Sequence, residues 1–294
     1  MAIQEDGWFV KGANSLDWGM KNRLARIFSR DSGKTVMLAI DHGYFEGPIP
    51  GLEQVDQNIV PFVDHADALM ATRGVLRTSI PAAFPRGVVL RATGGPSVMK
   101  ELSNERIAVD VEDALRLNVA GLAVTVYIGG EYETQTVHNM TKLVDLGNRH
   151  GIPILAVTCV VDESMGNVKY YRMACRICAE LGAHFVKTYF VEGNFESVIS
   201  SCPVPVVVAG GNKVSEFDAL TMTHRVMQAG AAGMDMGRNI FQAESPLAMI
   251  QAVRAVVHGG ETPKKAFELY ETLKSSHKVH GIASRSTQHP RTSV

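Results

Sequence analysis

The sequence predicts a (β/α)₈ barrel, an α/β fold in which eight parallel strands alternate with helices. Short apolar runs recur along the chain, and each is followed by a segment whose apolar residues have helical spacing. The runs are apolar throughout, which is typical of parallel strands covered on both faces. A doubly wound open sheet is the alternative, because the first units are short. The expected strands span residues 35–41, 68–72, 88–93, 121–128, 153–159, 185–190, 205–211 and 233–239.

Two segments lie outside the expected barrel. Residues 1–34 form an N-terminal extension with the amphipathic stretch LDWGMKNRLARIF, which is expected to plug the bottom of the barrel or to contact a neighbouring subunit. Residues 35–274 form the barrel with its C-terminal helix, and residues 275–294 form a polar tail that we expect to be disordered. The tail histidines are irregularly spaced, so no metal site is predicted there.

Composition excludes several classes of function. The formal net charge of the 294 residues is −1 and the pI is near 6.8, so the chain lacks the basic field that attracts nucleic acid or anionic membranes. The sequence shows neither a long apolar run nor the features of a signal peptide, so we expect a cytoplasmic protein. Cys175 and Cys178 form a C-x-x-C pair inside a helical pattern, which favours core packing over redox or zinc chemistry.

The segment HFVKTYF, residues 184–190, places a lysine in an apolar strand. Alternation puts Phe185, Lys187 and Tyr189 on one face, where a free charge is costly to bury. One interpretation is a lysine whose ammonium reaches solvent or pairs with a carboxylate. The other is a desolvated amine that forms an imine with a carbonyl substrate. An imine of this kind accepts the electrons of a breaking carbon–carbon bond.

Catalytic groups of a barrel come from the carboxyl ends of its strands. The first strand ends AIDHGYF, so Asp41 and His42 are expected at the mouth, where they can act as base, acid or proton shuttle. A turn-capping aspartate beside an exposed histidine explains the same pair equally well. Tyr127 ends the fourth strand, and Arg91 and Thr93 end the third. These three are candidate substrate contacts, although a half-buried strand tyrosine also accounts for Tyr127.

The seventh and eighth strands end in glycine-bearing loops, VAGGNK and MDMGRNI. Backbone N–H groups of Gly210, Gly211, Gly237 and Arg238 are arranged to cradle a phosphate, and Lys213 and Arg238 supply one cation per loop. Barrels often hold a phosphate after these two strands. Either loop alone is weak evidence, since glycine is ordinary at such turns. The two loops together predict a phosphate site.

The motifs LAIDHGYF, VKTYFVE, VAGGNK and DMGRNIFQ together resemble those of the class I, Schiff-base aldolases of the archaeal fructose-bisphosphate aldolase type. The similarity extends from about Lys11 to about Leu273 and includes LDWGM, TRGVLR, VYIGGEYE and ETPKKAFELY. Within this family the chain is most similar to the thiolases of autoinducer-2 catabolism, which act on 3-hydroxy-5-phosphonooxypentane-2,4-dione.

The resemblance implies that Lys187 forms the Schiff base, that Asp41 and His42 transfer protons, and that the glycine loops hold the substrate phosphate. Aldolases of this family use a tyrosine on the fifth strand for proton transfer, but here that strand reads PILAVTCVVDE. The absence of this tyrosine favours a different reaction, in which an acetyl group is transferred to coenzyme A as co-substrate. The other product of this reaction is dihydroxyacetone phosphate. A cysteine-thiolase mechanism through Cys159 is disfavoured, because the family uses no such nucleophile and buried thiols are usually inert.

Two other functions remain open on the sequence. One is a class I aldolase that acts on a sugar phosphate such as fructose 1,6-bisphosphate. The other is a sugar-phosphate-binding barrel without catalysis. The resemblance also implies a homo-oligomer of five or ten subunits. It implies no bound cofactor and no metal, since a lysine mechanism needs neither.

Overall fold

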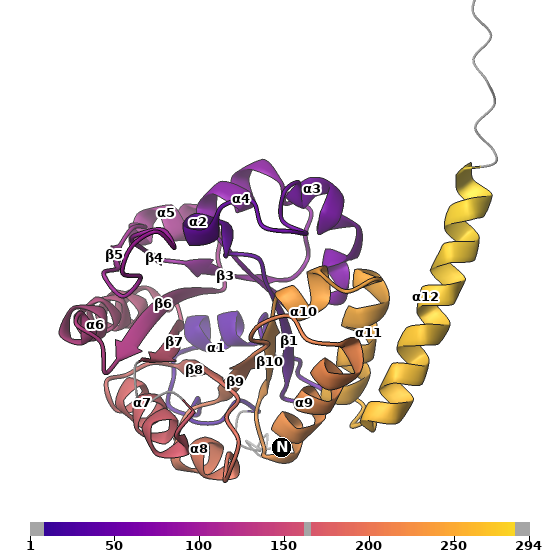
Figure 1. Ribbon diagram of the computed structural model, residues 1–294. Coiled ribbons are helices and arrows are strands. Elements are labelled where there is room, and N and C mark those ends of the chain that lie inside the picture. The colour runs from indigo at the N-terminus through magenta and orange to yellow at the C-terminus, as the bar shows by residue number, and fades with distance from the viewer. Residues whose placement is uncertain (1–8, 162–165, 286–294) are drawn as a thin grey trace, which may run out of the picture.

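Eight parallel strands close into a barrel, as the sequence predicts. The computed structural model describes residues 9–161 and 166–285, with side chains up to residue 276. The strands follow chain order around the ring, and β1 pairs with β10 to close it (Figure 1). The open-sheet alternative is therefore wrong. The barrel strands are β1 (Thr35–Ala39), β2 (Ala68–Ala71), β3 (Gly87–Arg91), β6 (Gly121–Ile128), β7 (Ile154–Val160), β8 (Phe185–Tyr189), β9 (Val206–Ala209) and β10 (Gly233–Met236).

The closing pair of strands depends on a glycine. The backbone of Gly233 has a φ of +141°, and a Cβ built there would lie 2.0 Å from the carbonyl oxygen of Thr35. Side-chain-bearing residues rarely adopt this backbone conformation, and none would fit against β1. Gly233 thus allows the first and last strands to meet in register, with Thr35 opposite Gly233.

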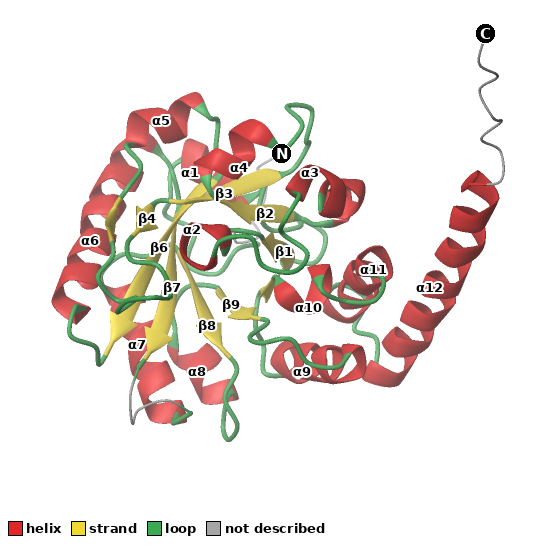
Figure 2. Cartoon of the chain, turned by 45° about the horizontal axis from the view of Figure 1, so that its top comes forward, coloured by secondary structure: helices red, strands yellow, loops and turns green. Residues whose placement is uncertain are grey.

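Helices surround the barrel and follow most strands (Figure 2). Local capping explains several of their ends: the Ser215 side chain accepts from the Asp218 N–H at the start of α9, and Gly151 ends α6 in the left-handed conformation. None of the described helices is both long and apolar enough to cross a membrane. The helices are α1 (Trp18–Leu24), α2 (Gly43–Glu46), α3 (Val55–Asn58), the 3₁₀ helix η1 (Val60–His65), α4 (Arg73–Thr78), α5 (Val111–Arg116), α6 (Glu133–His150), α7 (Val168–Glu180), α8 (Glu196–Ser201), α9 (Glu216–Gln228), α10 (Arg238–Phe241), α11 (Pro246–Val257) and α12 (Pro263–Arg285).

A small antiparallel sheet is absent from the sequence prediction. It consists of β4 (Thr93–Gly94) and β5 (Arg106–Ile107) and follows β3 directly. Strands of two residues are too short to show any period in the sequence. Their connection carries Leu102 to the mouth of the barrel, so the sheet contributes to the functional site.

The N-terminal extension plugs the bottom of the barrel. Met20, Leu24, Ile27 and Phe28 are almost fully buried and belong to one apolar cluster with inward-facing strand residues. The ring of Phe28 meets that of Phe185 edge to face, with centroids 5.6 Å apart. Seen along the barrel, α1 lies within the ring of strands (Figure 1). The first of the two roles expected for this segment is therefore observed, and the second, contact with a neighbouring subunit, stays a prediction.

The last helix extends further than expected. Helix α12 contacts α9 and α11, and its C-terminal end leads away from the barrel (Figures 1 and 2). The sequence shows no apolar period after about Ser275, yet the helix continues to Arg285. The hydroxyls of Ser275 and Ser276 donate to carbonyls one turn earlier, and an established helix adds one hydrogen bond for each further residue. Helix α12 thus continues through Arg285 into the segment expected to be a disordered tail, and residues 286–294 of that segment lie outside the described part.

A buried histidine near the barrel bottom makes stability depend on pH. Nδ1 of His184 accepts from the Ile154 N–H at 3.1 Å, and Nε2 faces Asn148 Oδ1 at 3.1 Å. An accepting nitrogen must be unprotonated, and burial lowers the pKa of His184 from 6.5 to about 4. As the pH falls, His184 binds a proton in the unfolded chain before it does so in the folded protein. Its contribution to folding stability is therefore complete above pH ~6.5 and is lost progressively toward pH ~4.

We therefore expect the melting temperature to fall between pH 7 and pH 5. In the variant His184→Gln the slope of this fall should be smaller, because one of the groups that bind protons on unfolding is gone. The exposed His138 on α6 is the matched control, since His138→Gln should leave the slope unchanged. Thermal scans at closely spaced pH values measure all three proteins. Equal slopes for wild type and His184→Gln would contradict this account.

Candidate active site

A cavity of about 230 Å³ opens at the carboxyl ends of the barrel strands. Its size suits a small substrate. Within the described residues, no group of three His, Cys, Asp or Glu side chains is arranged to hold a metal ion. A larger cavity of about 420 Å³ lies at the opposite end of the barrel, away from the strand ends where catalytic groups gather. The lining of the smaller cavity comprises Asp41, His42, Tyr44, Phe45, Glu46, Arg91, Leu102, Thr125, Tyr127, Val157, Cys159, Lys187, Tyr189 and Arg238.

Lys187 projects into this cavity from β8. It lies one step above Phe185 on the inward face and is 8% exposed. Its Nζ is 2.8 Å from Oδ2 of Asp235 on β10, and 3.8 Å from the sulfur of Met70. Burial raises the pKa of Asp235, although the neighbouring ammonium opposes the effect. The lysine is therefore paired, as one sequence interpretation held, and it also faces the cavity, as the other required.

Asp41 is held at the mouth by Arg91. Nε and Nη2 of Arg91 both lie 2.9 Å from Oδ2 of Asp41, and both side chains are buried. Burial alone would raise the pKa of Asp41, but the charge of Arg91, aided by that of Lys187, holds it below its usual value. Asp41 is thus a carboxylate at neutral pH, and Arg91 orients it and does not face the cavity as a free cation.

His42 stands beside Asp41 as a neutral imidazole. Burial lowers the pKa of His42 to about 4, and the nearby Asp41 only partly offsets this. Its Nδ1 is buried and has no hydrogen-bond partner among the described residues. The ring packs edge to face against Phe241, with centroids 5.8 Å apart. The residue lines the cavity, so its imidazole is close enough to a bound molecule to take part in proton exchange.

Two tyrosines and a cysteine complete the polar lining. Tyr127 on β6 is the register partner of Cys159 on β7, and Tyr189 follows Lys187 on the inward face of β8. Burial raises the pKa of Tyr127, and the nearby Cys159 together with burial raises that of Tyr189, so both keep their hydroxyl protons. Burial also raises the pKa of Cys159 to about 11. A protonated thiol is a weak nucleophile, so the cavity contains no preformed thiolate at this position.

The two glycine loops are joined by Asn239. This buried amide donates to the carbonyls of Gly210 and Asn212 at 2.7 and 2.9 Å, and its oxygen accepts from the Val214 N–H at 2.8 Å. Of the residues predicted to bind phosphate, Arg238 lines the cavity, with its Nη1 3.9 Å from Glu46. Gly237 lies beside His42, whereas Gly210 and Gly211 are set back from the lining.

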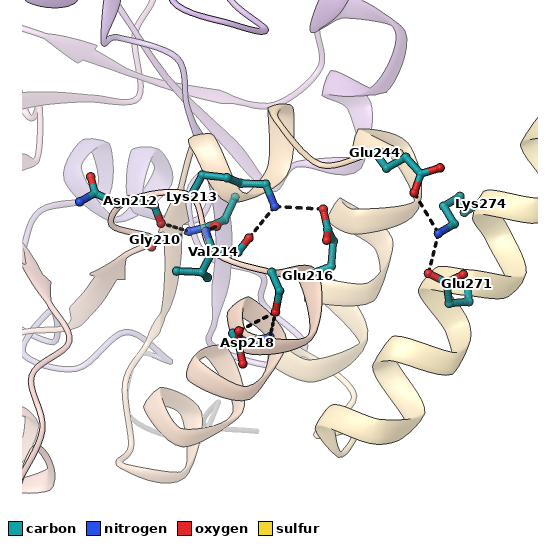
Figure 3. A network of polar contacts seen from close by, with 11 residues as sticks. Gly210, Asn212, Lys213, Val214, Glu216, Asp218, Glu244, Glu271 and Lys274 are labelled. Atoms are coloured by element: carbon teal, nitrogen blue, oxygen red, sulfur yellow. Dashed lines mark hydrogen bonds and ion pairs between the residues drawn. The ribbon is translucent and has the colours of Figure 1, made fainter.

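Lys213 does not reach the cavity. Its Nζ donates to the carbonyl of Val214 at 2.6 Å and pairs with Glu216 at 3.0 Å, at the start of α9 (Figure 3). The position of Lys213 in the loop after β9 was predicted from the sequence, but the direction of its side chain was not. A carboxylate three residues later provides a local partner that competes with the cavity.

Asp235, Tyr44 and Glu105 lie at or beside the site and were not predicted from the sequence. Asp235 had a signal, because GMDMG sets a carboxylate inside an apolar strand. Two buried charges of opposite sign in one barrel are expected to pair. Glu105 had no comparable signal, since it lies in a loop just before β5. It comes close to the site only when distant parts of the chain pack together in the folded protein.

We expect Gly237→Ala to impair the site directly. A Cβ on Gly237 would lie 2.6 Å from both the Ala39 carbonyl oxygen and Cε1 of His42, so either β1 or the imidazole must move. Overpacking of this kind costs about 1–3 kcal/mol, and we expect kcat/KM to fall about tenfold or more. Gly74→Ala is the control, because its nearest neighbour atom is 3.9 Å away. Steady-state kinetics that show equal losses in both variants would refute a local effect.

Comparison with known proteins decides the family. A sequence model of DeoC/LacD family aldolases matches residues 35–243, which include every barrel strand. The chain belongs to the DeoC/LacD aldolase family. Family relatives with curated names include the 3-hydroxy-5-phosphonooxypentane-2,4-dione thiolase of Klebsiella pneumoniae, 56% identical over 90% of both chains. The thiolase of the same name from Escherichia coli K12 is 53% identical over 90% of this chain and 91% of that protein.

Solved structures support the same family. A crystal structure of an archaeal fructose 1,6-bisphosphate aldolase is 25% identical, covers 82% of this chain and 99% of its own, and superposes with a TM-score of 0.72. A second archaeal fructose-1,6-bisphosphate aldolase, with its catalytic lysine bound to the carbinolamine intermediate of the substrate, is also 25% identical, with a TM-score of 0.70. The resemblance to class I aldolases is therefore confirmed.

Proposed function

We propose that this protein is a thiolase that transfers an acetyl group from 3-hydroxy-5-phosphonooxypentane-2,4-dione to coenzyme A. The products are acetyl-CoA and dihydroxyacetone phosphate. The observation that carries the proposal is a buried lysine, Lys187, at the wall of a small cavity in a chain that is 52–56% identical to thiolases of this name. Coenzyme A acts as co-substrate, and no bound cofactor is invoked.

The first step requires a neutral amine. Lys187 loses a proton and attacks the carbonyl that dihydroxyacetone phosphate retains; loss of water gives a protonated imine. Asp235 lies 2.8 Å from the amine and has a raised pKa, so it is suited to accept the proton that the ammonium must lose. The partner that neutralises the buried lysine thus also prepares it for reaction.

The second step breaks the carbon–carbon bond. The thiolate of coenzyme A attacks the acetyl carbonyl, and the bond between this carbon and the next one breaks. Its electron pair moves into the protonated imine and forms an enamine. Protonation of the enamine carbon and hydrolysis of the imine then release dihydroxyacetone phosphate and the free lysine. The reaction involves no net oxidation or reduction and so needs neither an oxidant nor a reductant.

Asp41 and His42 are proposed to move the protons of this sequence. Asp41 is ionised and oriented by Arg91, and His42 is neutral with a buried, unpaired Nδ1. One group is therefore ready to accept a proton, and the other can accept one and return it. The hydroxyls of Tyr127 and Tyr189 are proposed to hydrogen-bond the substrate oxygens from the strands on either side of β7.

Arg238 is the proposed phosphate ligand, aided by the backbone of Gly237, which lies beside His42. Among the described residues that line the cavity, the cations are Lys187, Arg91 and Arg238. Lys187 is reserved for the imine and Arg91 is neutralised by Asp41 at 2.9 Å, which leaves Arg238, whose contact with Glu46 is longer at 3.9 Å, for one phosphate. A substrate with one phosphate fits this arrangement better than fructose 1,6-bisphosphate, whose second phosphate would lack a cationic partner.

A class I aldolase is the second candidate, favoured by the superposition on archaeal fructose-bisphosphate aldolases. The assay that separates the two uses purified protein with the phosphorylated dione, with and without coenzyme A, and follows products by mass spectrometry. Acetyl-CoA that forms only with both enzyme and coenzyme A supports the thiolase. Cleavage of a sugar phosphate without coenzyme A would favour the aldolase, and tight binding without turnover would favour a non-catalytic barrel.

The proposal extends to the setting of the reaction. A thiolase of this kind would serve autoinducer-2 catabolism in the cytoplasm, where coenzyme A is present. A homo-oligomer of five or ten subunits is proposed from the family resemblance. Light scattering of the purified protein measures the subunit count independently of activity.

A further inference from the structure

We propose that Glu105 is a positioning residue that fixes the carboxylate of Asp41 through Tyr44 and Arg91. The inference rests on the proposed role of Asp41 in proton transfer. Glu105 is not itself part of the cavity lining and has no direct bond to Asp41, although it bonds the lining residue Tyr44, and no pattern in the sequence points to it. It is nevertheless 2% exposed, and its carboxylate is fully engaged by groups that lead to the site.

The carboxylate of Glu105 bonds to two hydroxyls. Its Oε1 accepts from the hydroxyl of Tyr44 at 2.5 Å, and its Oε2 accepts from the hydroxyl of Thr93. Thr93 Oγ1 in turn accepts from the backbone N–H of Thr125 at 3.3 Å. Hydrogen bonds to an ionised acceptor are roughly twice as strong as neutral ones, so this carboxylate fixes both side chains firmly.

Tyr44 transmits this constraint to Arg91. The guanidinium of Arg91 lies over the Tyr44 ring, 5.0 Å from its centroid. Arg91 then donates from Nε and Nη2 to Asp41 and from Nη1 to the hydroxyl of Thr125. The ring fixes the plane of the guanidinium, and that plane sets the direction from which both N–H groups reach Asp41.

Glu105 also contributes charge. Burial alone would lower the pKa of Arg91, but Asp41, Tyr44 and Glu105 together raise it, so the guanidinium stays charged in a buried site. Arg91 therefore has a second anion near it besides Asp41. Anions close to a buried cation make its charge tolerable.

Glu105 itself is anchored from a different element. Its carbonyl oxygen accepts from the amides of Gln135 and Asn139 on α6, at 2.6 and 2.9 Å. The chain of contacts thus begins on the outer helix and passes through Glu105, Tyr44 and Arg91 to Asp41. The links are contiguous and at least partly buried, so displacement of the first should be felt at the last.

The test uses Glu105→Leu, Glu105→Gln and Tyr44→Phe. Leucine has a similar size and accepts no hydrogen bond, whereas glutamine keeps an oxygen for the Tyr44 hydroxyl. We expect Glu105→Leu to lower kcat about 10- to 100-fold with KM changed less than about threefold, and Glu105→Gln to recover most of the loss. Tyr44→Phe should lower kcat similarly, and the double variant Tyr44→Phe/Glu105→Leu should be no worse than the poorer single variant.

A control and a structural readout separate this role from general stabilisation. Glu101→Leu changes an exposed carboxylate of the same loop, which bonds Ser103, and should leave kcat unchanged. A crystal structure of Glu105→Leu should show the 2.9 Å contacts between Arg91 and Asp41 broken, and that of Glu105→Gln should show them kept.

The readouts distinguish two kinds of failure. If the wild type does not turn over the dione, the proposed function fails, and the crystal structures still decide the positioning role. Unchanged kcat in folded Glu105→Leu, multiplicative losses in the double variant, or an intact Arg91–Asp41 pair in Glu105→Leu would each overturn the inference.

Discussion

Replacement of Lys187 by alanine is expected to reduce turnover at least about a thousandfold, because the imine that accepts the electrons of the breaking bond can no longer form. The protein should still fold. Asp235 loses its partner, but burial already raises its pKa, so it can take up a proton and become neutral. Product formation from the dione and coenzyme A measures the loss, and circular dichroism verifies the fold.

The matched control for this experiment is Lys142→Ala. Lys142 is exposed on α6, outside the cavity, so its removal should leave turnover unchanged. Retention of more than about a tenth of the activity in folded Lys187→Ala would mean that another group carries the chemistry. Cys159 would then require attention, despite a pKa raised to about 11.

Asp235→Asn is expected to produce the second largest effect. Loss of a positioned proton acceptor typically costs about 10²- to 10⁴-fold, and we expect kcat to fall within this range. Formation of the imine, measured alone, should extend to lower pH, because an ammonium without a neighbouring anion releases its proton more readily. The two measurements together separate the acid–base role of Asp235 from simple loss of the ion pair.

The control for Asp235 is Asp145→Asn, an exposed carboxylate on α6. It should change neither turnover nor the pH range of imine formation. If Asp235→Asn turns over like the wild type, the pair with Lys187 is structural only. If its imine forms over a narrower pH range on the acid side, the assumed direction of the electrostatic effect is wrong.

The barrel could be predicted because its signal is repeated and local. Each strand is a short, continuously apolar run, and buried parallel strands require this pattern. The small sheet of β4 and β5 could not be predicted, because two-residue strands leave no period. The extent of α12 was not predicted, because its last turns continue a helix that is already formed.

In the candidate site, the positions of residues could be predicted from the sequence, but the directions of their side chains could not. Lys187, Asp41, His42 and Arg238 were predicted from their places at strand ends, and all four line the cavity. The direction of a side chain depends on its neighbours, so the turn of Lys213 toward Glu216 could not be foreseen.

The remaining omissions have two causes. Asp235 was not predicted although its charge stands alone in an apolar strand. The other two residues meet through a contact between distant segments. Glu105 and Tyr44 lie 61 residues apart and meet only in the folded chain. No local pattern in the sequence encodes such a contact.

The central claim is that Lys187 forms an imine with the substrate, and borohydride reduction tests it most directly. The protein is incubated with the phosphorylated dione without coenzyme A, reduced, digested and analysed by mass spectrometry. The account predicts the mass of the reduced adduct on the peptide that carries Lys187, dependent on substrate and absent in Lys187→Ala. An adduct on a different lysine, or full turnover without any trapped adduct, would contradict it.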